Sequence, residues 1–465
     1  MKINILYIVV VIFTTTITNA QSKEDSLLHV DDFYQLVKAY HPIARQATLI
    51  ASRAEFEVMR AKGAFDPKLA SKYNNKRFED KQYYDTWNSY LHLPTRFNLD
   101  FKAGYERNDG VFLNPENNVP NTGLYYAGVS VPLGQGLLVN TRNIELKKSR
   151  ITGMSLENEA KIVLNNLLLD ANHTYWLWYE AYEKSRLVSS NLTFITIRYE
   201  GIRQAAINGE VAAIDSTEAL IQAQQWGNNL KKADLEFVNS QLLLQNFVWS
   251  DSLNTGDFFP LMIANNSVES LDIYYDQLVS HPELETIRLK NTMIALDRKL
   301  SVEQLKPTID LNYNFLLSEQ NNAREHAFLS NNYKAGVDFS FPLFLRKERA
   351  KLKSVNIKQQ ENELKLSQKL REITNKVNQS YNKCLTLRDM IAEQERMIAN
   401  YIILLEGERT KFNNGESSIF LINSRENKRI AAEIKLIELQ AEYGKTLGKL
   451  WWSAGIFGQD LSLTE

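Results

Sequence analysis

An eleven-residue stretch occurs twice in this chain of 465 residues. Residues 200–210 read EGIRQAAINGE and residues 406–416 read EGERTKFNNGE, with six identical positions and no gap. Glycine adopts the left-handed backbone conformation that ends a helix, and asparagine tolerates it nearly as well. Each copy lies within more than a hundred residues that lack proline. Each Asn-Gly pair therefore predicts a tight turn between two long antiparallel helices.

Other segments repeat in the same order, which a chance match between two helix ends does not explain. The first three recur at a constant offset of 240 residues. Of the other two, one lies within the predicted return strands and one at their ends. The matched pairs are His41-Pro42 with His281-Pro282, Pro67 with Pro307, Tyr73 with Tyr313, Ala127-Gly128-Val129 with Ala335-Gly336-Val337, and Val131-Pro132-Leu133 with Phe341-Pro342-Leu343. The sequence thus predicts two repeats, residues 21–260 and 261–465, each with the order helix, strands, long helix, Asn-Gly turn, helix.

The N-terminus has the order of a secretory signal peptide. Lys2 is followed by the apolar run Ile5–Phe13 and by a stretch that ends in the small residue Ala20. The apolar run is too short to span a bilayer, so residues 1–20 are expected to be removed on export. No later stretch offers 18 consecutive apolar residues, and no cysteine near residue 20 could carry a lipid anchor.

Helix lengths restrict the architecture. Residues 27–64 are predicted as one helix, and residues 141–206 and 347–412 as two helices of equal length. At about 1.5 Å per residue each long helix would extend roughly 100 Å. The two shorter helices of each half have a similar summed length, so we expect them to lie end to end beside the long one, with the strands at the end opposite the turn. The stripe Ile430, Ile434, Ile437 and Ala441 has coiled-coil spacing.

The segments at about 67–131 and 307–341 alternate with the two-residue period of strands. After Pro307, for example, Ile309, Leu311, Tyr313 and Phe315 alternate with polar residues. Strands of this length with one aromatic-rich face and one polar face are typical of a membrane barrel. Two to four strands cannot close such a barrel, and unpaired edges are not tolerated in lipid, so several chains must share it.

The duplicated order of elements, the His-Pro helix starts, the Pro-Leu strand ends and the Asn-Gly turns together resemble the TolC-type outer-membrane efflux proteins over essentially the whole mature chain. The resemblance implies an α plus membrane β fold: a long α-helical coiled-coil barrel joined to strands of a shared outer-membrane β-barrel. It implies a homotrimer with four strands per chain in a twelve-stranded barrel. It also implies an exit duct for efflux or type I secretion that reaches into the periplasm of a Gram-negative cell and works with a periplasmic adaptor and an inner-membrane transporter.

The first departure from the family pattern is a longer strand region in the first repeat. Pro67 and Pro132 are 65 residues apart, whereas Pro307 and Pro342 are 35 apart. The extra segment, at about 80–107, has room for one more hairpin. The sequence leaves open whether that hairpin joins the barrel or covers its mouth.

The second departure concerns the periplasmic tip. The resemblance implies an adaptor contact at Asn208, Gly209, Asn414 and Gly415 and, in many members, a gate of two aspartates six and nine residues beyond the second tip glycine. Those positions are Leu421 and Ser424 here, and the first repeat has Asp215 and Glu218 at the equivalent places. Three copies of this acidic pair would form a ring that favours cations. Alternatively, the two acids only offset the dipole of a helix N-terminus.

Other functions find little support in the sequence. The 54 basic and 55 acidic residues nearly cancel, which gives no electrostatic case for nucleic acid. Cys384 is the single cysteine, and the six histidines have no metal-ligand spacing. No phosphate loop or nucleophile elbow is present, so we expect no enzyme activity, cofactor or metal. The rival is a soluble periplasmic coiled-coil adaptor or structural rod, which needs helical hairpins but no lipid-compatible strands.

Overall fold

The computed structural model describes residues 27–249, 258–261, 268–317 and 332–457. The predicted signal peptide therefore lies outside the described residues. The chain folds into two compact units, each built from both repeats. We call the first the helical unit; it comprises residues 1–40, 171–267 and 389–444. We call the second the sheet unit; it comprises residues 41–170, 268–388 and 445–465.

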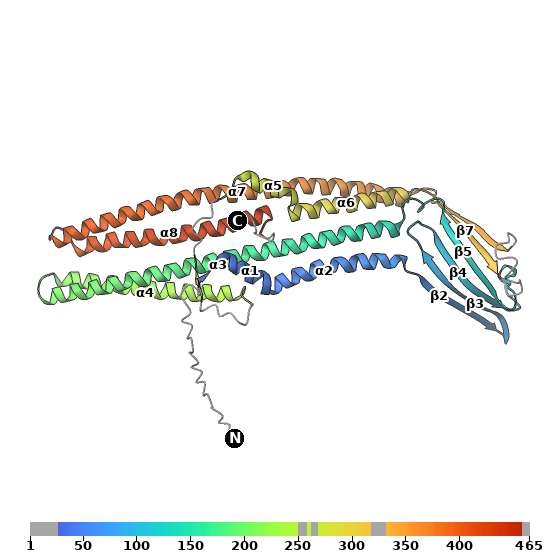
Figure 1. Cartoon of the computed structure of the whole chain (residues 1–465), viewed down its shortest axis with the longest axis horizontal. Coiled ribbons are helices and arrows are strands. Elements are labelled where there is room, and N and C mark those ends of the chain that lie inside the picture. Colours follow the sequence, from blue (N-terminus) through green and yellow to red (C-terminus); the bar gives the residue numbers. More distant parts are fainter. Residues whose placement is uncertain (1–26, 250–257, 262–267, 318–331, 458–465) are drawn as a thin grey trace, which may run out of the picture. The chain divides into compact units, whose positions relative to one another are not determined.

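The long helices form where the sequence predicts them (Figure 1). The predicted spans 141–206 and 347–412 correspond to helices α3 (Thr141–Ile207) and α7 (Arg346–Asn413), which contribute to both units. Helix α4 (Ala213–Gln245) follows α3, and α8 (Ile419–Ala454) follows α7. None of the described helices has a stretch long and apolar enough to cross a membrane.

The core of the helical unit is a set of apolar side chains between helices. Val188 and Ile195 of α3, Trp226 of α4 and Ile430 of α8 form one buried cluster, with Ile434 packed against it. Ile437 and Ala441 are also buried. The spacing of this stripe is therefore explained by helix packing, as predicted.

The prediction of one helix over residues 27–64 is wrong. The chain forms α1 (Val30–Tyr40) and α2 (Pro42–Lys62), with His41 between them. The Ile43 amide donates to Nδ1 of His41 at 3.1 Å. In the second repeat α5 (Leu271–Gln277) precedes α6 (Pro282–Glu303), and the Glu283 amide donates to Nδ1 of His281 at 3.2 Å.

The repeated His-Pro pair is thus a helix start. The histidine caps an unpaired backbone N–H, and proline suits the first helical position because it has no N–H to satisfy. A proline there cannot donate to a preceding helical turn, so the earlier helix has to end.

The sheet unit contains a six-stranded antiparallel sheet with the order β2-β3-β4-β5-β7-β8. Its strands are β2 (Lys68–Phe78), β3 (Lys81–Pro94), β4 (Asp100–Asp109), β5 (Leu124–Pro132), β7 (Thr308–Leu317) and β8 (Tyr333–Ser340). The extra segment at about 80–107 forms β3 and most of β4. It is inserted in the sheet between β2 and β5, so the sheet of one chain has six strands, two more than the four that the resemblance implies for each chain in the barrel. A separate short parallel pair joins β1 (Leu27–Leu28) to β6 (Phe259–Pro260) in the helical unit.

Candidate functional site

Both tips have the same backbone geometry. The loops 208–212 and 414–418 join α3 to α4 and α7 to α8. Gly209 and Gly415 have φ of +79° and +77°. The Glu210 amide donates to the carbonyl five residues earlier at 2.9 Å, and the Gly209 amide donates to the carbonyl three residues earlier at 3.1 Å.

The second tip repeats this pair of hydrogen bonds at Glu416 and Gly415, each at 2.9 Å. The pattern is a Schellman cap, in which the left-handed residue after the helix lets two amides reach the last carbonyls. The predicted turns are therefore present in both copies, with glycine at the position that requires it. An added Cβ at Gly209 or Gly415 would meet no atom within 4 Å, so both glycines lie at an open surface.

The four predicted constriction residues lie on α4 and α8 of the helical unit. Asp215 is in the first turn of α4, whose preceding residue Ala212 provides no side-chain cap. Asp215 and Glu218 are half-buried, as is Ser424, whereas Leu421 is exposed. An acidic residue in an uncapped first turn fits the helix-dipole interpretation, and the half-exposed position is equally compatible with a ring around an axis.

An ionic cluster that the sequence did not indicate lies between the helices of this unit. Arg198 of α3 pairs with the buried Glu426 of α8 at 2.6 Å, and Arg409 of α7 lies 3.8 Å from the same carboxylate. Arg425 pairs with Glu408 at 3.3 Å. These contacts tie the α3/α4 hairpin to the α7/α8 hairpin and fix the α7–α8 turn.

The carboxyl of Glu408 is held in its charged form. It accepts a hydrogen bond from the Ser417 hydroxyl at 2.6 Å. This bond and the neighbouring Arg425 lower the pKa of Glu408 below its usual value.

The sheet has one apolar face. Residues that pair across neighbouring strands point to the same face, so the strand registers determine which side chains belong to it. Among its large side chains, those that are exposed are Leu69, Tyr73, Trp87, Leu91, Phe101, Tyr125, Phe315, Leu317, Tyr333, Val337 and Phe339. Aromatic rings cross this face: Trp87 lies 6.0 Å from Tyr105, which lies 4.9 Å from Tyr125, and Tyr313 lies 5.7 Å from Tyr333, all between ring centroids. Such aromatic rows are a feature of lipid-facing barrel surfaces.

The opposite face is polar. Its residues include Lys68, Lys72, Lys76, Thr86, Asn88, His92, Asp100, Lys102, Glu106, Ser130, Asp310, Asn312, Asn314, Lys334 and Asp338. At the end of the sheet that adjoins the helices, Asp100, Asp310 and Asp338 share a polar pocket of about 350 Å³ with Asn140 and Arg142. The two faces match the alternation predicted for a strand between lipid and water.

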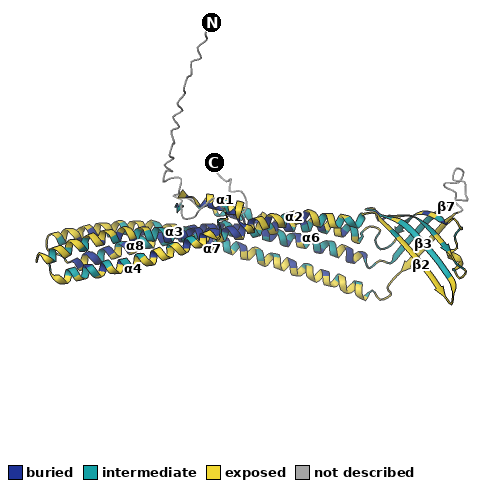
Figure 2. Ribbon diagram, turned by 90° about the horizontal axis from the view of Figure 1, so that it is seen from below, coloured by how far each residue is buried: buried dark blue, intermediate teal, exposed yellow. Residues whose placement is uncertain are grey.

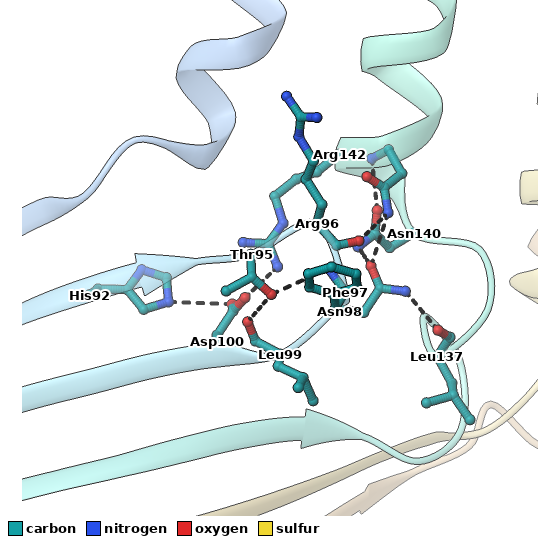
Figure 3. A network of polar contacts seen from close by, with 11 residues as sticks. His92, Thr95, Arg96, Phe97, Asn98, Leu99, Asp100, Leu137, Asn140 and Arg142 are labelled. Atoms are coloured by element: carbon teal, nitrogen blue, oxygen red, sulfur yellow. Dashed lines mark hydrogen bonds and ion pairs between the residues drawn. The ribbon is translucent and has the colours of Figure 1, made fainter.

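A network of amides and charges joins this end of the sheet to the start of α3 (Figure 3). The amide nitrogen of Asn98 donates to Leu137 O at 2.6 Å, and Asn140 donates to the side-chain oxygen of Asn98. The Asn143 backbone amide donates to Oδ1 of Asn140 at 2.7 Å, so Asn140 caps α3.

Asp100 extends the network toward the polar face of the sheet. Its carboxylate pairs with Arg142 at 2.6 Å and lies 3.3 Å from the ring of His92. The sequence pattern alone did not point to these residues. Asn140, a capping residue immediately before the helical pattern, was the one available signal.

No group of three or more His, Cys, Asp or Glu residues among those described could hold a metal ion. Cys384 is fully buried, and burial raises the pKa of its thiol to about 12.

Comparisons with known proteins agree with this geometry. Residues 273–450 match the model of a family described as outer membrane efflux protein. VceC, an outer membrane protein of Vibrio cholerae, has a similar structure, with a TM-score of 0.67 and 14% identity over 92% of this chain and 96% of that chain.

Two other solved structures are also similar. The CmeC outer membrane channel of Campylobacter jejuni matches with a TM-score of 0.64 and 12% identity over 92% of this chain and 86% of that chain. CusC, described as forming a transmembrane channel, matches with a TM-score of 0.65 and 14% identity over 91% of each chain. No curated protein matches the sequence. The second repeat thus matches the outer membrane efflux protein family over residues 273–450, and the whole chain has the fold of these solved channels.

Proposed function

We propose that the protein is a passive exit duct of the outer membrane for efflux or type I secretion, and that it acts as a homotrimer with a periplasmic adaptor and an inner-membrane transporter. The observation that carries the proposal is the two-faced sheet. Its exposed apolar face, which includes Leu69, Trp87 and Phe339, suits lipid, while its polar face suits water.

The exposed apolar face also favours the channel over a soluble periplasmic adaptor or rod. Soluble proteins rarely expose contiguous apolar patches larger than a few hundred Å². The match of residues 273–450 to the outer membrane efflux protein family and the structural likeness to outer membrane channels support the same choice. The duct has no reaction of its own, because the transporter supplies the energy, and a wide aqueous path need not recognise its cargo.

Insertion can be tested with two aspartate substitutions on one strand. Phe339→Asp places a charge on the apolar face of β8, whereas Gly336→Asp places it on the polar face, where an added Cβ meets no atom. We expect Phe339→Asp to reduce the outer-membrane fraction severely and Gly336→Asp to leave it near the wild-type amount.

The same preparations test conduction and assembly. The wild-type protein and the Gly336→Asp variant are expected to migrate as a detergent-resistant trimer and to conduct ions in planar bilayers. A wild-type protein that remains in the soluble periplasmic fraction as a non-conducting monomer would contradict the proposal.

The two tips, with Asn208-Gly209 and Asn414-Gly415, are the proposed contact with the adaptor. Both tip glycines are exposed, and both turns have the same pair of backbone hydrogen bonds, so each chain presents two similar surfaces. A substitution there can act only through backbone strain or through a partner, because an added side chain meets nothing in the chain itself.

Gly415→Asn and Gly415→Val form a matched pair for the tips. Asparagine tolerates positive φ, whereas a β-branched residue does not. We expect Gly415→Val to abolish efflux and cross-linking to the adaptor while the barrel stays inserted, and Gly415→Asn to retain most of both. Loss of insertion in the valine variant would contradict the assignment of the tip to the adaptor.

A further inference from the structure

With the inserted strands included, the sheet still has two open edges, which pair with no other strand among the described residues. The strands β2 and β8 each have one neighbour in the sheet of the described residues, β3 and β7 respectively. The residues of β8 are exposed along its whole length. Those of β2 are nearly all exposed as well (Figure 2). In a bilayer an unpaired strand edge has no water to satisfy its N–H and C=O groups.

The sheet cannot close on itself. Eight strands already give a barrel interior just wide enough for its own side chains. A barrel of six would force the lysines and carboxylates of the polar face, such as Lys72 and Asp338, into a smaller space. The edges therefore need a second copy of the chain.

The directions of the strands fit this occupant. All neighbouring strands are antiparallel and the sheet has six of them, so β2 and β8 run in opposite directions. Pairing β2 of one copy with β8 of the next consequently continues the antiparallel ladder without a break. If the sheet had an odd number of strands, its two edge strands would run in the same direction, and the pair between neighbouring copies would be parallel.

The charges of the two edges are complementary. The polar face of β2 carries Lys68, Lys72 and Lys76 and no acidic residue. On β8, Asp338 lies opposite Asp310 of β7, an arrangement of like charges that is unfavourable by itself. A neighbouring β2 strand would bring lysines beside this pair of carboxylates.

The side-chain alternation restricts the register to steps of two residues, because an odd step would bring apolar side chains to the polar face. We compare three such registers, in which Gly336 of β8 lies opposite Ala70, Lys72 or Asn74 on the polar face of β2. The first and third place a lysine of β2 directly opposite Lys334. The second avoids this and puts Asp338 diagonal to both Lys68 and Lys72.

We propose that β2 of one copy pairs with β8 of the next, so that every copy contributes all six strands to one shared barrel. This inference rests on the proposed homotrimer, for which it gives eighteen strands instead of the twelve that the family resemblance implies. Barrel diameter grows roughly linearly with strand number, and barrels of 16–18 strands enclose an aqueous channel. The membrane pore is then about half as wide again as a twelve-stranded one.

The alternative is that the hairpin β2–β3 leaves the sheet in the assembled protein, so that β4 becomes the edge that meets β8. Disulfide trapping separates the two arrangements. Gly336→Cys is the common probe, because an added Cβ there meets no atom within 4 Å. It is combined in one chain with Ala70→Cys, Lys72→Cys or Asn74→Cys on β2, or with Lys102→Cys on the same face of β4.

Cys384 does not compete in this test, because it is buried and its raised pKa keeps the thiol protonated at neutral pH. Gly336→Cys with Ser71→Cys serves as the matched control, since Ser71 lies on the apolar face. After oxidation we expect most chains of the Lys72→Cys pair to form a ladder of covalent dimers and trimers, and the control to remain below a tenth of that yield.

The cross-linked assembly should be taken, without denaturation, from the membrane fraction that conducts ions, and the mass of the whole assembly should equal three chains, even where only two of them are covalently joined. Efficient trapping through any of the three β2 positions supports the shared six-strand arrangement. Trapping through Lys102→Cys, trapping at none of the sites, or a mass of two chains overturns the eighteen-stranded barrel. A conducting trimer that traps through β4 would leave the exit duct intact as the function, whereas absence from the outer membrane would contradict the function itself.

Discussion

Arg198 of α3 forms an ion pair with Glu426 of α8 at 2.6 Å, although the two residues are 228 positions apart. The carboxylate of Glu426 is buried, with 3% of the residue exposed. A buried ion pair gains little over an apolar pair, but removal of one partner leaves a buried charge without compensation. The pair therefore specifies how the two hairpins associate more than it adds to stability.

Arg198→Met should destabilise the protein more than the double variant Arg198→Met/Glu426→Gln does. We expect about 2 kcal/mol for the single change, because Arg409 still lies 3.8 Å from the carboxylate. The double variant should recover at least half of this loss. A thermal-unfolding double-mutant cycle on the purified protein measures the coupling, and additive effects of the two substitutions would show that the pair is not coupled.

Gly444 of α8 lies against the indole of Trp176 on α3. A Cβ at residue 444 would come within 2.0 Å of the indole ring, so Gly444→Ala requires the ring or the helix to shift. Overpacking of this kind costs about 1–3 kcal/mol. Gly407 in α7 is the matched control, because an added Cβ there meets no atom within 4 Å.

The two substitutions should change the free energy of unfolding in opposite directions. Gly407→Ala removes backbone freedom from the unfolded chain at a helical site and should stabilise the protein by about 0.5–1 kcal/mol. Thermal melts of both variants at one pH measure the difference. Equal changes in both would indicate that helix propensity, and not the contact with Trp176, decides the effect.

His281 gives the fold a pH-dependent contact. Burial lowers the pKa of His281 below the usual 6.5, and the charges of Lys369 and Lys376 act in the same direction. In its neutral form the ring accepts a hydrogen bond from the Glu283 amide. A group with a lowered folded-state pKa stabilises the fold fully above the unfolded-state value. That contribution is lost as the pH falls below about 6.5 toward the folded-state pKa.

The matched variant for this contact is His281→Asn, which retains a side-chain acceptor at the helix start and does not titrate. We expect the melting temperature of the wild-type protein to fall between pH 7 and pH 5 by more than that of His281→Asn. His281→Ala should lose about 1 kcal/mol at pH 7, as typical for removal of a cap. Identical pH profiles for wild type and His281→Asn would place the titrating group elsewhere.

The features that were predictable from the sequence are those set locally. The Asn-Gly tips need positive φ at Gly209 and Gly415, and the bounds of α3 and α7 follow from a helical period without proline. The hairpin β7–β8 was also predictable, because its apolar residues stay on one face.

Three features were not predictable, each for a physical reason. The helical period continues through His41, so only the proline after it marks the break. The segment at about 80–107 was predicted to have room for a hairpin, but its place in the sheet was left open, because Tyr84 and Tyr90 occupy the polar face of β3 and blur the alternation. The pairing of Arg198 with Glu426 depends on which helices meet, and a single sequence contains no record of that contact.

Asp215 and Glu218 remain the candidates for a constriction near the first tip. In the proposed trimer, three copies of each would form an acidic ring, which raises the local concentration of cations. The competing explanation assigns Asp215 to the dipole of α4, whose preceding residue Ala212 provides no side-chain cap.

Charge-removing substitutions distinguish the two explanations through different measurements. If the ring exists, the double variant Asp215→Asn/Glu218→Gln should lose most of the cation selectivity measured from reversal potentials across a salt gradient in planar bilayers. If only the dipole matters, the double variant should lose about 0.3–1 kcal/mol of stability with unchanged selectivity. Asp234→Asn, a charge removal further along the same helix, is the control and should leave the selectivity at the wild-type value. A shift of the same size in this control would mean that the net charge of the duct, and not a ring at residues 215 and 218, sets its preference for cations.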